Sequence, residues 1–148
     1  MARSTDCDDH PVRAANREAV RQLHDQDESG RLRRIPLFEL LDENVEWEAL
    51  GPTELFPWAG THRGHDAVRR WFELLSAAMA YDRFELLELY ADGETVVEVI
   101  AAAGTSRATG TSLASEVVRV WTFRNEKAIR VRSYYDTHAY AAALRLSS

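Results

Sequence analysis

The chain has one cysteine among its 148 residues and no long apolar run. This lone cysteine, Cys7, excludes an internal disulfide and a metal site made of several thiolates. A membrane-spanning helix needs about 18 or more consecutive apolar residues, and no segment approaches that length. The first ten residues, MARSTDCDDH, are polar and do not resemble a secretory signal. We therefore expect a cytoplasmic protein without a membrane partner.

Lysine is also scarce, since Lys127 is the single one, and acidic residues outnumber basic ones to give a net charge of −6. No basic stripe interleaved with aromatic residues is present, which argues against a nucleic-acid partner. The hydrophobic content of 45% and the charged content of 28% are those of an ordinary globular protein of one domain. We expect a flexible tail over residues 1–10 and a single domain over residues 11–148.

Helical spacing of apolar residues predicts a first helix over about residues 11–30. A short second helix is expected over residues 36–43 (PLFELLDE), and a strand is expected over residues 44–48. A third helix should begin at Asp66, which is a plausible N-cap, and continue its apolar face as far as Met79.

The second half of the chain alternates between apolar runs and turn residues. The runs predict four strands, and a final helix capped by Asp136 should follow them. The expected strands cover residues 84–90, 94–103, 115–123 and 128–135. Helices first and consecutive strands afterwards predict an α+β fold with an antiparallel sheet.

Two tryptophans stand where the chain leaves the first predicted strand. Trp47 lies near the end of this strand, and Trp58 follows in a loop that also contains Pro52 and Pro57. Tryptophan buries a large area and keeps one polar edge, which suits the mouth of a ligand pocket. Because tryptophan is also highly buried in ordinary cores, the two residues could equally plug one end of the core.

Four segments resemble the SnoaL-like family of the ketosteroid isomerase and nuclear transport factor 2-like superfamily. They are WAGTHRGHDAVRRWF, YADGETVVEV, RATGTS and VWTFRNEKAIRVRSYYDTHAYAAAL, and the resemblance runs from about residue 14 to residue 144. It implies a cone-shaped, curved antiparallel sheet wrapped around N-terminal helices, an α+β barrel with a deep apolar pocket. It also implies a homodimer through the convex face of the sheet. That face is expected to carry Val97, Val99, Val118 and Val120.

The catalytic sets known in that superfamily are missing at the matching positions. Ketosteroid isomerases use a general-base Asp with an oxyanion hole of Tyr and protonated Asp. These positions hold Trp47, Leu23 and Arg119 in this chain. The Arg and the two Asp residues of limonene-epoxide hydrolases correspond to Ile100, Ala102 and Ser133. The resemblance therefore implies the fold more strongly than any one reaction.

Strand parity sends Glu98 and Arg119 inward together with the family's pocket positions, because side chains alternate across a strand. A carboxylate in an apolar cavity can act as a general acid or base. Alternatively, Glu98 and Arg119 form a buried ion pair that only holds the sheet together. Both interpretations stay open.

The first helix and the loop before the third helix add three polar candidates. His24 and Asp27 share one helix face, and a carboxylate beside an imidazole suits acid–base chemistry. If the helix frays after Leu23, both side chains are instead solvated. His62, in GTHRG, could gate the pocket or simply be exposed. A metal site would need several ligands to converge, and we expect none.

We therefore expect a small cofactor-free enzyme that isomerises or cyclises a bulky apolar, polyketide- or terpenoid-like molecule by proton transfer. The catalytic candidates are Glu98, His24, Arg119 and Asp27. The candidates for lining the substrate pocket are Trp47, Trp58, His62, Phe72, Ile100, Ala102, Trp121, Ser133 and Tyr135. The alternatives are a non-catalytic protein that binds a small apolar ligand and an epoxide-hydrolase-like enzyme with a rearranged site.

Overall fold

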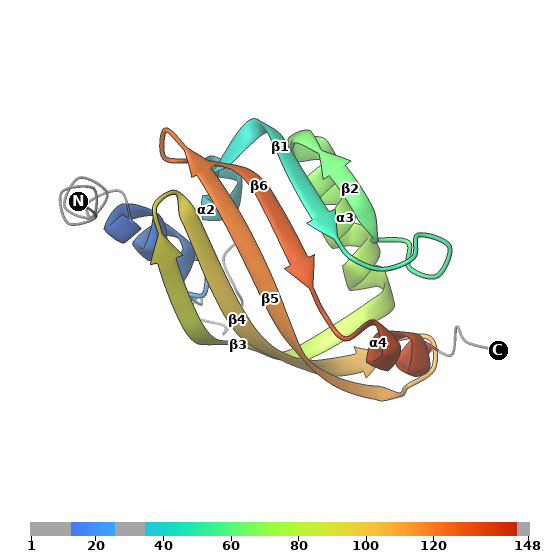
Figure 1. Cartoon of the computed structure of the whole chain (residues 1–148). Helices are drawn as coiled ribbons and strands as arrows, with labels where there is room; N and C mark the ends of the chain where they lie inside the picture. The colour runs from blue at the N-terminus through green and yellow to red at the C-terminus, as the bar shows by residue number, and fades with distance from the viewer. Residues whose placement is uncertain (1–12, 26–34, 145–148) are drawn as a thin grey trace.

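The computed structural model describes residues 13–25 and 35–144, so the predicted tail and Asp27 lie outside the described residues. Helical residues 13–22 come first (Figure 1). The elements that follow are α2 (Ile35–Leu40), β1 (Leu41–Ala49), β2 (Gly60–Arg63), α3 (Gly64–Ala78), β3 (Met79–Asp92), β4 (Thr95–Ser106), β5 (Ser112–Arg124), β6 (Lys127–Tyr134) and α4 (Thr137–Leu144).

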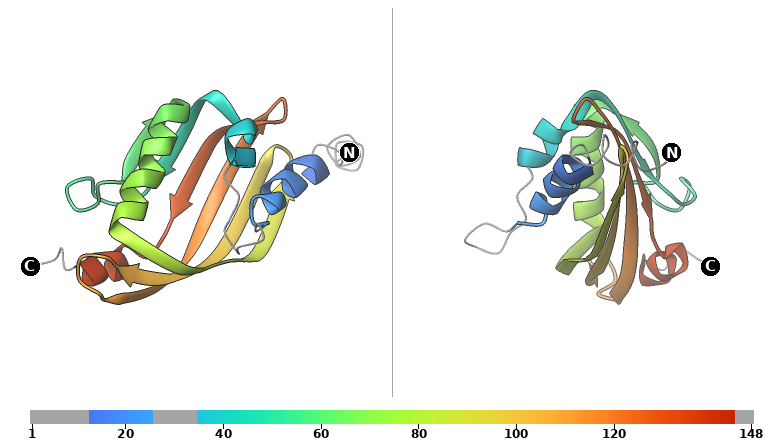
Figure 2. Two further views of the ribbon diagram at one scale, coloured as in Figure 1. Left: turned by 180° about the vertical axis from the view of Figure 1, so that it is seen from behind. Right: turned by 60° about the vertical axis from the view of Figure 1, so that its left-hand side comes forward.

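One six-stranded sheet, in the order β2-β1-β6-β5-β4-β3, carries the fold. Neighbouring strands are antiparallel except β1 and β6, which run parallel. The sheet curves around helical residues 13–22, α2 and α3, which lie on the same side of it (Figure 2). The element α4 packs against β4 and β5. The expected α+β cone is confirmed, with two corrections: one strand pair is parallel, and the sheet is open rather than a closed barrel.

The alternation of side chains along β4 follows the predicted parity. Every second residue from Val96 to Ser106 is buried, and the residues between them are partly exposed. Register pairing then carries the same parity into β5, where Ile100 lies opposite Val117 and Val96 lies opposite Trp121. The inward face of the two strands is therefore the one expected from the sequence. The outward valines, including Val97 and Val99, are partly exposed, and the homodimer through that face stays a prediction.

The first half of the chain differs from its predicted elements at three boundaries. The second helix ends at Leu40, because β1 begins at the buried Leu41 and alternates into the core from Val45 through Trp47. The strand β2 was not predicted: residues 60–63 pair antiparallel with the end of β1. The helix α3 begins at Gly64, so Asp66 is not its N-cap and instead pairs with an arginine in the first turn.

The strand β3 is longer than predicted, and it is interrupted by two register shifts. It begins at Met79, which was expected at the end of the preceding helix, and it continues to Asp92. Its register against β4 shifts between Tyr81 and Arg83 and again between Leu86 and Glu88. Bulges interrupt the two-residue alternation that strand prediction relies on, and they bend the strand.

The predicted turns and the last helix cap are confirmed. Asn125 and Glu126 have positive φ values of 51° and 66°, as the two central residues of a tight hairpin require. The Asp136 Oδ1 atom accepts a hydrogen bond of 2.9 Å from the Ala139 N–H, which caps α4. In the part of the chain that the structure describes, no helix is long and apolar enough to span a membrane.

Candidate active site

A fully buried carboxylate, Glu98, is the centre of a four-residue polar cluster. Its Oε2 atom contacts the His24 Nε2 atom in a short hydrogen bond, and its Oε1 atom accepts a 2.7 Å bond from the Trp121 indole N–H. The Arg119 Nη1 atom lies 3.8 Å from Oε1, close enough for an ion pair and too far for a hydrogen bond. We call these four residues the Glu98 cluster.

The secondary structure explains how three members of the cluster meet. Glu98 on β4 lies directly opposite Arg119 on β5, and Trp121 is two residues further on the same face. His24 lies just after helical residues 13–22, which cover the inner side of the sheet that carries the other three residues. The fully buried Val20 anchors that helix, and His24 continues it in a turn closed by its N–H to the Arg21 carbonyl at 3.0 Å.

Aromatic rings surround the charged members of the cluster. The Arg119 guanidinium lies over Trp47, with 5.7 Å from Cζ to the ring centroid, and over Phe84 at 5.2 Å. The His24 ring stacks on Phe84 with centroids 6.0 Å apart. Among the described residues, neither His24 Nδ1 nor Arg119 Nε has a hydrogen-bond partner, although both atoms are buried. The cluster therefore keeps unused hydrogen-bonding capacity inside the protein.

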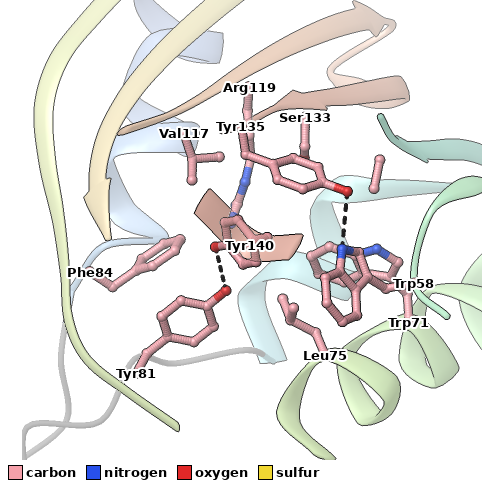
Figure 3. Close-up of a pocket in the computed structure, with 11 residues that line it drawn as sticks. Trp58, Trp71, Leu75, Tyr81, Phe84, Val117, Arg119, Ser133, Tyr135 and Tyr140 are labelled. Carbon is pink, nitrogen blue, oxygen red and sulfur yellow. Dashed lines mark hydrogen bonds between the residues drawn. The ribbon is translucent and has the colours of Figure 1, made fainter. Parts of the chain in front are cut away.

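A small cavity adjoins the cluster and shares Arg119 and Phe84 with it (Figure 3). Its volume is about 40 Å³, which holds only a few water molecules. Its walls combine residues of the sheet, α3, α4 and the loop after β1. They are Ala49, Trp58, Trp71, Leu75, Tyr81, Phe84, Val117, Arg119, Ser133, Tyr135 and Tyr140. The cavity is mostly aromatic, and Arg119 is the one charged wall residue among those that the structure describes.

Two pairs of polar side chains face each other across this cavity (Figure 3). The hydroxyls of Tyr81 and Tyr140 are 2.6 Å apart. On the other side, the Trp58 indole N–H donates a 3.1 Å bond to the Tyr135 hydroxyl, which in turn donates to the Leu50 carbonyl. The Tyr135 hydroxyl is thus used as both acceptor and donor.

Two further wall groups are buried without a hydrogen-bond partner among the described residues. They are the Ser133 hydroxyl on β6 and the Trp71 indole N–H on α3. Both residues are 4% exposed, so bulk water does not solvate these groups. A buried donor left without a partner costs free energy, about 1–3 kcal/mol in proteins. Buried groups of this kind are rare in proteins, so each one calls for an explanation such as a bound water, an ion or a catalytic role.

The cavity tyrosines should resist ionisation in the folded protein. Burial raises the pKa of Tyr135 to about 12 and also raises the pKa of Tyr81 and Tyr140. A folded-state pKa above the unfolded value of about 10 gives stability that is present below pH 10 and is lost as the pH rises further. We expect these tyrosines to ionise together with alkaline unfolding. Phenolate absorbance and circular dichroism, recorded in one pH titration, test this. Ionisation of all five tyrosines near pH 10 in a folded protein would contradict it.

The predicted site residues fall into three groups. Trp58, Arg119, Ser133 and Tyr135 line the cavity. Glu98 and His24 lie together behind Arg119 and do not line it. The remaining predicted pocket residues were expected at the ligand surface and are instead packed beside the cavity, in the core or in β2. These residues are Trp47, His62, Phe72, Ile100, Ala102 and Trp121.

Specific contacts explain two of these placements. Trp47 packs its fully buried ring against Trp71 and Trp121, with centroids 5.2 Å and 6.1 Å away, so it fills the core. The interpretation of Trp47 as a core plug is therefore favoured over a pocket mouth. His62 bonds through Nε2 to the Trp58 carbonyl at 2.9 Å and so tethers the loop that carries Trp58. Among the residues that the structure describes, no group of His, Cys, Asp and Glu could hold a metal ion.

Seven of the eleven wall residues were not among the predicted site residues: Ala49, Trp71, Leu75, Tyr81, Phe84, Val117 and Tyr140. Tyr81 was assigned no element because the bulge after it hides the strand. Tyr140 did have a signal, since it is the one aromatic side chain in the alanine-rich run AYAAAL. A single bulky residue on a helix of small ones marks the side that packs.

Comparison with known proteins places the chain in a family. A family model described as the SnoaL-like domain matches residues 13–131. No curated protein gives a significant match. A nuclear transport factor 2-like protein from Burkholderia xenovorans LB400 is similar at 29% identity, with a TM-score of 0.71 over 88% of this chain and 96% of that one.

Other solved structures share the fold. A nuclear transport factor 2-like protein from Burkholderia thailandensis E264 is 27% identical, with a TM-score of 0.75 over 87% of this chain and 96% of that one. TerC, co-crystallised with polyporic acid, is 22% identical, with a TM-score of 0.76 over 88% and 98% of the two chains. Because the family model covers most of the chain, the chain belongs to the SnoaL-like domain family.

Proposed function

We propose that this protein binds a small, mainly apolar carbonyl compound in the aromatic cavity and moves a proton on it. The family and fold support a small isomerase-type or ligand-binding protein. The observation that carries the finer proposal is the Glu98 cluster, a buried carboxylate next to a histidine that has one ring nitrogen unused. Burying such charges costs several kcal/mol per ion, so an arrangement of this kind needs a reason beyond packing.

His24 is the proposed acid–base group. An ionised carboxylate can only accept hydrogen bonds, so the bond to Glu98 places the imidazole hydrogen on Nε2. The neutral ring then has its lone pair on Nδ1, which is free among the described residues. In the proposed reaction, Nδ1 takes a proton from the carbon next to the carbonyl, and the C–H electrons move into an enolate. Return of that proton to a different carbon completes the isomerisation.

Arg119 is proposed to stabilise the enolate oxygen. Its guanidinium lines the cavity, and its Nε–H has no partner among the described residues. A donor fixed in advance in a water-poor site stabilises developing negative charge strongly. Glu98 is then a positioning residue, because it contacts Arg119 and His24 and does not reach the ligand.

The ligand must displace a side chain to enter, since the cavity of about 40 Å³ is smaller than an organic ring system. Phe84 is the proposed mobile residue. It is partly exposed, it lines the cavity, and its ring stacks on His24. Its displacement would open the cavity towards His24 Nδ1.

Hydrogen–deuterium exchange on 2-tetralone, an aromatic ketone with acidic C–H bonds, tests the proposal. We expect the protein to accelerate exchange next to the carbonyl, and His24→Gln to reduce that acceleration by about 100-fold, the effect typical of a positioned proton-transfer group. His138→Gln is the matched control, because this exposed histidine on α4 lies away from the cluster. Exchange that is no faster than in buffer, or that is equally fast in both variants, refutes the catalytic proposal.

The second candidate is a binding protein without catalysis, and one observation favours it. Glu98 is fully buried and satisfied by its three partners, so by itself it offers no group to a ligand. Binding of 2-tetralone or of polyporic acid, the compound co-crystallised with TerC, without any accelerated exchange would support this alternative.

A further inference from the structure

One wall residue of the cavity, Trp58, is held at three points. Its indole N–H donates a 3.1 Å hydrogen bond to the Tyr135 hydroxyl, and its carbonyl accepts a 2.9 Å bond from His62 Nε2. Its ring stacks on Phe56, with centroids 5.1 Å apart and ring planes inclined by 20°. Trp58 is also buried, so no solvent-filled space adjoins its ring into which it could turn. It therefore forms a fixed wall.

The loop after β1, which carries Trp58, closes on the Tyr135 hydroxyl. This hydroxyl donates to the Leu50 carbonyl at the start of the loop and accepts from Trp58 near its end. The loop also packs closely at this point. A Cβ added at Gly51 would lie 2.8 Å from the Phe56 ring and 3.1 Å from the Tyr135 oxygen. Moving Trp58 would therefore break a hydrogen bond at a tightly packed position.

The opposite wall of the cavity is built differently. Figure 3 shows Phe84 across the cavity from Trp58. Phe84 is partly exposed, and it lies between two register shifts of β3, the last strand in the order of the sheet. A strand at the edge of a sheet is paired along one side only, and bulges disrupt that pairing further. The cavity therefore has one wall that can yield, at Phe84, and one that is fixed, at Trp58.

We infer that Trp58 is a specificity-determining residue, which limits the ligands of this cavity to short planar ring compounds. A planar ligand that enters by displacing Phe84 must end at the Trp58 ring. Behind that ring lies Phe56, with its face nearly parallel to the indole. With a smaller residue at position 58, a further ring of the ligand can take the place of the indole and stack on Phe56.

The inference rests on the proposed function in one respect, namely that this cavity is the ligand site. It does not require that proton transfer takes place, because the length limit acts on binding.

Isothermal titration calorimetry with two ketones of equal chemistry and different length tests the inference. They are 2-tetralone, which has two fused rings, and its linear three-ring homologue, in which a naphthalene replaces the benzene ring. We expect the wild-type protein to bind 2-tetralone at least about tenfold more tightly, because the third ring would overlap Trp58. Trp58→Ala should bind the three-ring ketone at least about tenfold more tightly than 2-tetralone, because the added ring buries more apolar surface.

Trp47→Ala is the matched control for Trp58→Ala. It makes the same substitution at another fully buried tryptophan, which packs in the core and does not line the cavity. We expect it to keep the preference for 2-tetralone. The preference is the ratio of the two dissociation constants of one variant, so a smaller folded fraction affects both ligands equally and cancels.

Tyr135→Phe keeps the test informative if Trp58→Ala fails to fold. It removes only the hydroxyl that holds the Trp58 indole and the Leu50 carbonyl, so that Trp58 can turn aside. We expect the preference for 2-tetralone to fall by about fivefold, the effect of one hydrogen bond. Tyr134→Phe, at the outward-facing position before it, is the control and should leave the preference unchanged.

The outcomes separate the length limit from the proposed function. Equal binding of both ketones by the wild type overturns the limit and leaves the cavity as a ligand site. The same conclusion follows if Trp58→Ala keeps the wild-type preference, if Trp47→Ala changes it equally, or if Tyr135→Phe has no more effect than Tyr134→Phe. Failure of both ketones to bind either the wild type or Trp58→Ala overturns the limit and the cavity together. A preference that shifts as expected, without exchange on 2-tetralone, supports the limit and refutes only the catalytic step.

Discussion

Replacing Glu98 with glutamine is expected to lower the free energy of unfolding by about 3–5 kcal/mol, the usual cost of breaking a buried ion pair. The substitution keeps the shape of the side chain and removes its charge. Arg119, with a side chain that is 11% exposed, is then left buried without a counter-charge. Glutamine also has one acceptor oxygen in place of two, so His24 and Trp121 can no longer each donate to an oxygen of its own. Chemical denaturation monitored by tryptophan fluorescence measures the change.

A double variant provides the control for that result. Adding Arg119→Met to Glu98→Gln removes both charges, and we expect it to recover much of the lost stability, since apolar replacement of a buried pair is often neutral. A single variant as stable as the wild type would show that Glu98 does not hold the cluster. If Glu98→Gln is destabilised but exchanges 2-tetralone normally per folded molecule, the cluster has no part in proton transfer.

Alanine at Gly104 is the second change with a large expected effect, a loss of roughly 3 kcal/mol in the free energy of unfolding. A methyl group at Gly104 would lie 2.4 Å from the Ala80 carbonyl oxygen and 2.9 Å from the Tyr81 Cα atom. Both are backbone atoms of β3, so the strand pair must open to relieve the contact. Gly104 pairs with Tyr81 in the sheet, so Tyr81 should also move away from Tyr140.

Gly93→Ala is the matched control for the close approach of Gly104 to the backbone of β3. Gly93 has a φ of +60° and no heavy atom within 4 Å of an added Cβ, so its cost is the backbone strain alone, about 1–2 kcal/mol. Thermal unfolding of the two variants separates the cost of the contact with β3 from the cost of backbone strain. If Gly104→Ala costs no more than Gly93→Ala, the contact with β3 does not limit the strand pair. We also expect Gly104→Ala, and not Gly93→Ala, to weaken 2-tetralone binding, because Tyr81 lines the cavity.

Local patterns predicted the second half of the fold well. The runs of valine with turn residues between them located β4, β5 and β6, since a period of two is a property of each strand by itself. The same parity predicted that Glu98 and Arg119 share the inner face, because register in a buried hairpin is set by which side is apolar. The cap at Asp136 followed from one residue and its neighbours.

Local patterns failed where contacts with other elements of the fold decide the structure of a segment. The β3 bulges and the short strand β2 have little pattern of their own, and they form because neighbouring strands present free backbone groups to pair with. The inward parity of Trp47 was correct, but parity does not say whether an inward side chain packs in the core or borders a cavity. That depends on the neighbouring rings of Trp71 and Trp121, which come from other elements.

By itself, the sequence determined which side chains of β4 and β5 face inward. These include one carboxylate on β4 and one arginine opposite it on β5. Tertiary structure alone decided what these groups do. His24 meets Glu98 across 74 residues, and Tyr81 meets Tyr140 across 59, so neither contact leaves a trace in local spacing. The physical reason is that hydrogen-bond partners and cavity volume depend on three-dimensional packing, whereas side-chain direction along a strand depends only on the backbone.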